Sequence, residues 1–162
     1  MITFDKKGNP IIEQEATLIY NLSFGPIWHR FFQGFKNKKI LGTRCPKCKR
    51  VLVPARGFCP RCFVKIDEWV EVSQQGILES WVLVNYEYYN MPIEPPYIVA
   101  SIRLDGTDCS FIHMVGGFDL TNIDVVNKHI KIGDRVEAVW RKERYGNILD
   151  IEYFKPVKIK EH

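Results

Sequence analysis

The sequence predicts a mainly β fold, in which a short helix and a small metal-bound ribbon precede a barrel of about five strands. Two observations lead to this fold class. Cys45, Cys48, Cys59 and Cys62 form two Cys-x-x-Cys pairs that are ten residues apart, and this spacing is typical of a structural zinc site. From residue 68 onward, β-branched and aromatic residues alternate in segments that Gly, Pro, Asn and Asp separate, which is the pattern of successive strands.

The composition is that of an ordinary globular protein. Of the 162 residues, 46% are hydrophobic and 26% are charged. No apolar run approaches the roughly 20 residues that cross a bilayer, and no apolar segment follows the charged start of the chain, so we expect neither a membrane segment nor a signal peptide. We therefore expect a cytoplasmic protein whose five cysteines are reduced and better suited to metal than to disulfides.

The net charge gives little support to a nucleic-acid-binding role. The formal charge is +4, and a zinc ion held by four thiolates, which carries about −2, would leave the chain near +2. Proteins that bind nucleic acid usually have a more basic balance.

A helix is predicted after residue 22, with Ser23 as its N-cap and Pro26 in its first turn. Its apolar side chains recur with helical spacing and form a broad stripe. This stripe either packs on the protein's own core or docks on another protein, because a short helix before a small metal module has little core of its own. Residues 1–22 are expected to be loosely structured, with at most one short helix in "IIEQEATLIY", residues 11–20. The proposed docking residues are Trp28, Phe31, Phe32 and Phe35.

Strands are predicted on both sides of the cysteine pairs and through the rest of the chain. Two short strands, "KKILGTRC" and "RVLVPARGFC", each lead to or from a cysteine pair. Residues 116–129 form the longest connection and are expected to hold a turn of helix beginning at Thr121 or Asn122. A long link between the third and fourth of five strands fits a small Greek-key barrel of the OB type better than a sandwich. The later strands are expected near residues 68–73, 76–88, 97–105, 109–116, 134–144 and 147–154.

The two cysteine pairs predict a closed metal site. Each Cys-x-x-Cys turn places two sulfurs on one side of a tight loop, and two such turns supply the four thiolates that structural zinc prefers over iron. A site with four thiolates has no open position for substrate, so its role is to fold a segment too small for a core. A thioredoxin-like redox pair would need one motif on a βαβ frame, and no such pattern is present.

The ribbon segment is strongly basic, with six cationic residues and no acidic one between residues 44 and 62. These cations either offset the charge of the metal centre and face water, or converge on a ligand rich in phosphate, which Arg recognises by paired hydrogen bonds. Arg56, Arg61 and Lys47 are the first candidates for the second role. Cys109 and His113 lie on predicted strands and are interpreted as structural.

The order of these features resembles a known family. It begins with the aromatic helix and the run C-x-x-C…P-x-R-x-x-C-P-x-C, and continues with "EWVEVSQQGILESW", "PPYIVASIRLDG" and "IGDRVEAVW". Together they resemble the family that joins a rubredoxin-like zinc ribbon to an OB-fold, whose members are small partner subunits of thiolase-superfamily enzymes. The match covers roughly residues 25–157. Lys49 departs from it, because the family usually has Gly after the first cysteine pair.

The resemblance implies a fold and a function. It implies an N-terminal extension with a docking helix over residues 1–40, a zinc ribbon over 41–66 and an OB-fold barrel over 67–162. It also implies a structural zinc ion on Cys45, Cys48, Cys59 and Cys62. The chain would then be a non-catalytic subunit that binds a thiolase, synthase, aldolase or hydratase and helps to shape its acyl-CoA site, with the CoA phosphates near the ribbon cations. A heterotetramer is the natural assembly, since thiolases commonly dimerise.

Two other functions are compatible with parts of the sequence. A single-stranded nucleic-acid binder would use Trp81, Tyr86, Tyr88, Tyr89 and Tyr97 as stacking platforms, but the strands that carry them contain only one basic residue, Arg103. A rubredoxin-like electron carrier would hold iron in place of zinc.

Overall fold

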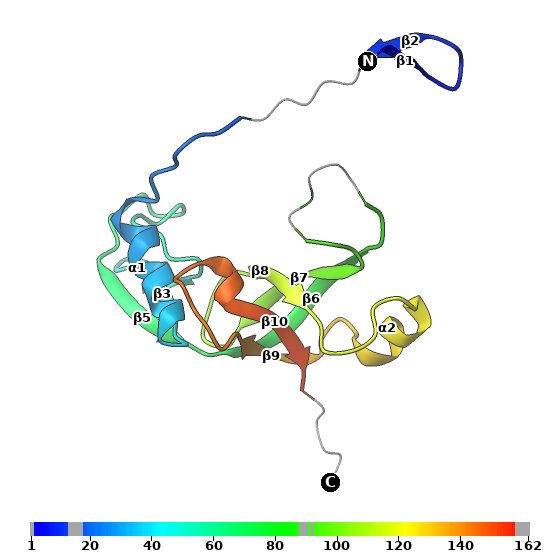
Figure 1. The fold of residues 1–162 in the computed structure, drawn as a ribbon. Helices are drawn as coiled ribbons and strands as arrows, with labels where there is room; N and C mark the ends of the chain where they lie inside the picture. The colour runs from blue at the N-terminus through cyan, green and yellow to red at the C-terminus, as the bar shows by residue number, and fades with distance from the viewer. Residues whose placement is uncertain (1, 13–17, 88–90, 92, 158–162) are drawn as a thin grey trace.

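The computed structural model describes residues 2–12, 18–87, 91 and 93–157. Its elements, in chain order, make a hairpin, a helix, a three-stranded ribbon sheet and a barrel with one inserted helix (Figure 1). They are β1 (Ile2–Phe4), β2 (Pro10–Ile12), α1 (Gly25–Lys36), β3 (Ile40–Arg44), β4 (Val51–Leu52), β5 (Glu68–Val72), β6 (Gln75–Val84), β7 (Tyr97–Leu104), β8 (Phe111–Val115), α2 (Ile123–His129), β9 (Arg135–Trp140), the 3₁₀ turn η1 (Ile148–Asp150) and β10 (Ile151–Pro156).

The barrel is closed and has the connectivity that the long link predicts. Its strands follow the order β6–β7–β8–β10–β9, and β9 returns to β6. All neighbours are antiparallel except β8 and β10, which are parallel. Helix α2 lies between β8 and β9, and the Asn122 side chain caps it by accepting a hydrogen bond from the Asp124 amide. The predicted five-stranded OB-type barrel is thus confirmed.

The ribbon sheet has the order β4–β3–β5. Strand β5 pairs with β3 along its whole length, from Ile40 opposite Val72 to Arg44 opposite Glu68. It therefore belongs by hydrogen bonding to the ribbon, although the sequence groups it with the barrel. Because β5 leads directly into β6, it also joins the two parts.

Helix α1 differs from its prediction at the N-terminus. The N-cap residue is Phe24, whose side chain makes no capping bond, so Ser23 does not cap the helix. Pro26 lies in the first turn as expected, where its missing N–H costs little.

The N-terminal region also differs from the prediction. Residues 2–12 form a small antiparallel hairpin, β1–β2, with Ile2 opposite Ile12. The expected short helix would fall between residues 11 and 20, where Ile11 and Ile12 are in β2, residues 18–20 have no regular structure and 13–17 lie outside the described residues. The apolar residues of the hairpin and of the segment that follows are exposed, among them Ile2, Phe4, Leu18, Ile19 and Leu22.

One core runs through the helix, the ribbon sheet and the barrel. Phe31 and Phe35 of α1 belong to the same buried cluster as Ile40 of β3 and Leu78 of β6. The helix approaches β3 closely at Gly34, where a Cβ atom would lie 2.8 Å from the Lys39 carbonyl oxygen and 2.9 Å from the Leu41 side chain. A second, smaller cluster surrounds the cysteine pairs and contains Leu52 and Ile66. Among the described residues, no helix is long and apolar enough to cross a membrane.

Candidate metal centre and ribbon surface

The four cysteines of the two pairs come together as a metal-ligand set. Their sulfur atoms all lie within 4.8 Å of one another, and the sulfurs of Cys48 and Cys59 are 3.8 Å apart. A tetrahedral site with zinc–sulfur bonds of about 2.3 Å requires sulfurs roughly 3.8 Å apart. Cys45 and Cys59 are buried, and Cys48 and Cys62 are half-buried. The site therefore fits the closed, structural zinc site that the spacing predicts.

Each cysteine pair forms a knuckle, a tight loop with the same backbone hydrogen bonds. In the first knuckle, the Cys45 amide donates to the Arg50 carbonyl and the Lys49 amide donates to the Cys45 carbonyl. In the second knuckle, the Cys59 amide donates to the Val64 carbonyl and the Phe63 amide to the Cys59 carbonyl. These bonds turn both sulfurs of each pair toward the same point.

The pKa values of the cysteine thiols also favour a cation at the centre of the four sulfurs. Although burial alone would raise the pKa of the Cys45 thiol, hydrogen bonds from Cys48 and from the backbone of Lys47 lower that pKa to about 6. Burial, together with the neighbouring sulfurs of Cys48 and Cys59, raises the pKa of Cys62 to about 12. Four crowded sulfurs cannot all ionise next to one another, and a bound divalent metal ion would stabilise all four as thiolates.

Lys49, which stands where the family usually has glycine, has the backbone conformation typical of a glycine. Lys49 has a φ of +63°, which is the left-handed conformation that a glycine adopts readily. The knuckle therefore has the same backbone turn with lysine as it would with glycine, although a residue with a Cβ atom is strained in this conformation.

The three cations proposed to meet CoA lie at different places on the ribbon. Arg56 is exposed and lines a groove of about 420 Å³ between α1 and the ribbon, together with Ile27, Trp28, Pro54, Ala55, Gly57 and Phe58. Lys47 and Arg61 are exposed at equivalent positions, each directly before the second cysteine of its knuckle. Among the described residues, no hydrogen bond or ion pair joins any two of the three, and their role toward CoA stays a prediction.

The buried Thr43 fixes the backbone of Arg56. Its hydroxyl donates to the Arg56 carbonyl at 3.0 Å and accepts from the Arg56 amide at 2.9 Å. This pair of bonds joins β3 to the ribbon segment that lines the groove. Thr43 was missed in the sequence, because a threonine in a predicted strand gives no sign of this contact.

The docking role expected of three helix residues needs correction. Phe31, Phe32 and Phe35 are 1%, 8% and 0% exposed, and the ring of Phe35 packs edge-on against Trp140 of the barrel at 5.6 Å. They are core residues and are not available to a partner. Trp28 is 44% exposed and stacks on the exposed Phe24, so it alone of the four lies on the surface.

Cys109 joins the ribbon to the barrel. Its sulfur accepts a hydrogen bond from the Val53 amide at 3.0 Å and lies 3.2 Å from the Val53 carbonyl oxygen. It packs against both buried clusters. These contacts give it a structural role.

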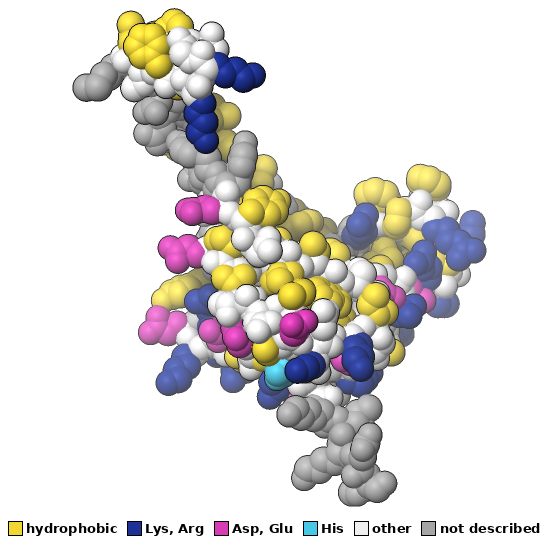
Figure 2. Space-filling view, turned by 90° about the vertical axis from the view of Figure 1, so that its right-hand side faces the viewer, with side chains coloured by type: hydrophobic (Ala, Val, Ile, Leu, Met, Phe, Trp, Pro, Cys, Tyr) yellow, Lys and Arg dark blue, Asp and Glu magenta, His cyan; other side chains and the backbone are white. Residues whose placement is uncertain are grey.

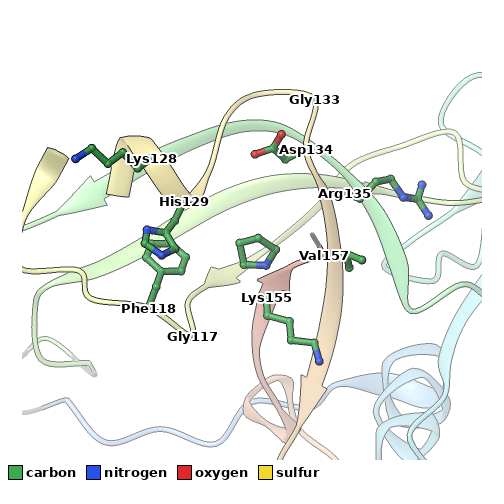
Figure 3. Close-up of a pocket in the computed structure, with 10 residues that line it drawn as sticks. Gly117, Phe118, Lys128, His129, Gly133, Asp134, Arg135, Lys155 and Val157 are labelled. Carbon is green, nitrogen blue, oxygen red and sulfur yellow. The ribbon is translucent and has the colours of Figure 1, made fainter. Parts of the chain in front are cut away.

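A second cavity, of about 580 Å³, lies at the end of the barrel beside α2 (Figure 3). The rings of Phe118 and His129 stack in it with centroids 4.9 Å apart, and Asp134 lies across from them. Figure 3 shows the charged ends of Lys128, Arg135 and Lys155 turned away from its centre. The guanidinium of Arg135 is bound to Asp105 at 2.6 Å, so this cavity does not offer a converging set of cations.

Figure 2 shows the side of the molecule that carries α2. Hydrophobic side chains lie across the middle of this face, acidic side chains gather along one edge, and Lys and Arg follow the lower border and gather again at the right-hand end. A face with both signs of charge differs from the continuous basic groove of a single-strand binder.

The structure thus defines a class of protein in which a closed four-cysteine ribbon is packed, through one helix, on an OB-fold barrel. Comparison with known families supports this description. Residues 32–68 match the rubredoxin-like zinc ribbon domain of ChsH2, and residues 69–141 match the C-terminal OB-fold domain of ChsH2. The chain belongs to this family, known as DUF35.

Similar proteins come from several sources. A DUF35 domain-containing scaffold protein of Methanothermobacter thermautotrophicus is 31% identical over 108 residues, which cover 65% of this chain and 74% of that protein. A crystal structure of a DUF35-family protein of unknown function from Sulfolobus solfataricus is 28% identical, with a TM-score of 0.55, and the match covers 71% of this chain and 78% of that one. A chain of the Ltp2–ChsH2(DUF35) aldolase shares the fold, with a TM-score of 0.57 and 24% identity over 78% of this chain and 91% of that one.

Proposed function

We propose that this chain is a non-catalytic accessory subunit of a thiolase-type acyl-CoA complex that cleaves or forms carbon–carbon bonds. The observation that carries the proposal is the groove between α1 and the ribbon, where an exposed tryptophan and an exposed arginine border an apolar floor. Tryptophan and arginine are the residues most enriched where proteins bind one another tightly. A relative described as a scaffold protein and a similar fold in an aldolase assembly support the same role.

The chemistry of the cysteines supports a role without catalysis in this chain. The four sulfurs of the ribbon form a closed set with no position for a substrate. The fifth, Cys109, is held by the backbone of Val53, whereas an activated nucleophile needs a base within hydrogen-bond reach. The residues that react with the thioester would therefore belong to the partner.

The ribbon cations support a place for CoA at the interface. Arg56 borders the groove, and among the described residues its side chain has no hydrogen bond or ion pair. In the proposed complex, Arg56, with Arg61 and Lys47, contacts the phosphates of CoA, which arginine recognises by paired hydrogen bonds. The apolar floor of the groove suits the uncharged part of an acyl-CoA or the partner's own side chains.

Purification from the protein's own cells tests the proposal. The full chain, carrying an affinity tag, is recovered under mild conditions, and the accompanying proteins are identified by peptide mass spectrometry. We expect a thiolase-superfamily subunit in equal amount, in an assembly with two copies of each chain. Recovery as a free monomer, with no thiolase-superfamily chain, would contradict the proposal.

A single-stranded nucleic-acid binder is less well supported. Of the proposed stacking residues, Trp81 and Tyr97 are half-buried and Tyr86 is exposed, while Tyr88 and Tyr89 lie outside the described residues. Arg103 is paired with Glu79 at 3.2 Å. Tight binding of single-stranded DNA that weakens steeply with salt would reverse this ranking.

A further inference from the structure

The two knuckles have nearly the same backbone but different side chains at one position. The residue after the second cysteine has a positive φ in both, +63° at Lys49 and +53° at Phe63. In both, the amide of this residue donates to the carbonyl of the first cysteine, at 3.0 Å and 2.9 Å. Both positions therefore require the same left-handed backbone conformation, which glycine adopts with the least strain.

Phe63 is an unfavourable residue for folding at this position. A bulky side chain in the left-handed region is strained, because its Cβ approaches the following carbonyl. The side chain is also 83% exposed, so it contributes little hydrophobic stabilisation to the folded chain. Lys49 bears the same strain but places its ammonium group in water. Folding thus gives no reason for an aromatic ring at Phe63.

The surroundings of Phe63 resemble the centre of a protein interface. Phe58, on the other side of the knuckle, is 56% exposed and also lines the groove with Trp28. Pro60 and Arg61, within the knuckle, are exposed. No acidic residue occurs in or next to the second knuckle, between residues 54 and 66. Exposed aromatic side chains in a basic setting complement an apolar pocket bordered by carboxylates.

We propose that Phe63, at the tip of the second knuckle, is the anchor by which this chain docks into an apolar, acid-rimmed pocket of its acyl-CoA enzyme partner. The inference rests on the proposed function and adds the contact point and the chemistry of the partner's surface. A protein is favoured over a nucleic acid as the occupant, since a single strand needs several aromatic platforms along a basic groove, and the second knuckle offers only Phe58 and Phe63.

The backbone supplies a matched pair of variants. Phe63→Gly and Lys49→Gly each replace a strained residue by glycine, so both variants are expected to fold at least as well as the parent chain. Full-length tagged wild type and both variants are expressed in the protein's own cells, and each is checked for one zinc per chain. The thiolase-superfamily subunit recovered with each is then quantified by peptide mass spectrometry. We expect Phe63→Gly to recover at least about tenfold less of it than wild type, and Lys49→Gly to recover the same amount.

The outcomes separate the two proposals. Equal recovery by wild type and Phe63→Gly would overturn the docking role of Phe63 and leave the proposed function standing. If wild type itself recovers no thiolase-superfamily subunit, the proposed function fails and the docking role fails with it. Two further measurements on the purified chain test other occupants. Dimerisation, or binding of an oligo(dT) strand, that Phe63→Gly abolishes would assign the knuckle to a second copy or to nucleic acid and overturn the inference.

Discussion

At the scale of single residues, the buried imidazole of His113 has a consequence for stability. Its Nε2 lies 3.0 Å from the Ile148 carbonyl oxygen, and its buried Nδ1 has no hydrogen-bond partner within the part of the chain that the structure describes. The ring packs between Phe111 and Phe154. This burial lowers the pKa of His113 below its ordinary value of 6.5.

The lowered pKa predicts that mild acid destabilises the protein through His113. Below about pH 6.5 the unfolded chain binds a proton at this residue while the folded chain does not, so stability falls as the pH falls. In urea unfolding at pH 7 and pH 5, His113→Leu should lose less stability between the two values than wild type. His29→Gln, at an exposed histidine, serves as the control and should behave as wild type. An equal loss in wild type and His113→Leu would contradict the prediction.

At the scale of elements, α1 has a buried face and an exposed face. Phe35 is fully buried between Phe31 and Trp140, whereas Trp28 is 44% exposed. Phe35→Ala should lower the free energy of unfolding by about 3–5 kcal/mol, and Trp28→Ala by about 1 kcal/mol or less. Chemical denaturation measures both losses. A loss at Trp28 as large as that at Phe35 would place Trp28 in the core and remove it from the proposed partner surface.

The ribbon should depend on its metal. Structural zinc contributes about 10–16 kcal/mol to small modules of this kind, so Cys45→Ser should bind much less than one zinc per chain and lose ordered amide signals over residues 45–66. Cys109→Ser is the matched control, since Cys109 is a cysteine outside the four-sulfur cluster, and it should keep a full zinc ion. Elemental analysis and NMR spectra give the two readouts. Iron in the wild-type protein would favour an electron carrier and contradict the structural role.

The elements also show what a sequence can and cannot predict. The cysteine pairs and the order of the barrel strands depend on local spacing, and both were predicted correctly. The bounds of the strands were less accurate, since the last strand, expected at 147–154, is Ile151–Pro156 and follows a 3₁₀ turn. The assignment of β5 depends on which neighbour accepts its hydrogen bonds, and that neighbour, β3, lies more than twenty residues earlier. The aromatic stripe of α1 shows that one face is apolar, but only the packed structure shows that Phe31 and Phe35 meet the barrel while Trp28 faces outward. The positive φ of Phe63 could not be predicted, because glycine is the usual sign of a positive φ in a sequence and this position holds phenylalanine.

At the scale of the whole molecule, the helix, the ribbon and the barrel share one buried cluster. The Cys109 sulfur and the Asp108 side chain also join the barrel to the backbone of Val53 and Val51 in the ribbon. Because of these links, the metal centre can fix the position of the groove relative to the barrel. The domain boundaries expected at residues 40 and 66 therefore stay predictions. The buried cluster that the helix, the ribbon and the barrel share extends across both of them.

The most direct test of this account is thioester turnover with and without the partner. The purified chain, its thiolase-superfamily partner and the reconstituted complex are each assayed with acyl-CoA substrates, and the acyl-CoA species consumed and formed are measured by chromatography. We predict no turnover by the chain alone, and faster turnover or lower KM for the complex than for the partner alone. Turnover by the chain alone, free of contaminating enzyme, would contradict the claim that it serves another protein's active site.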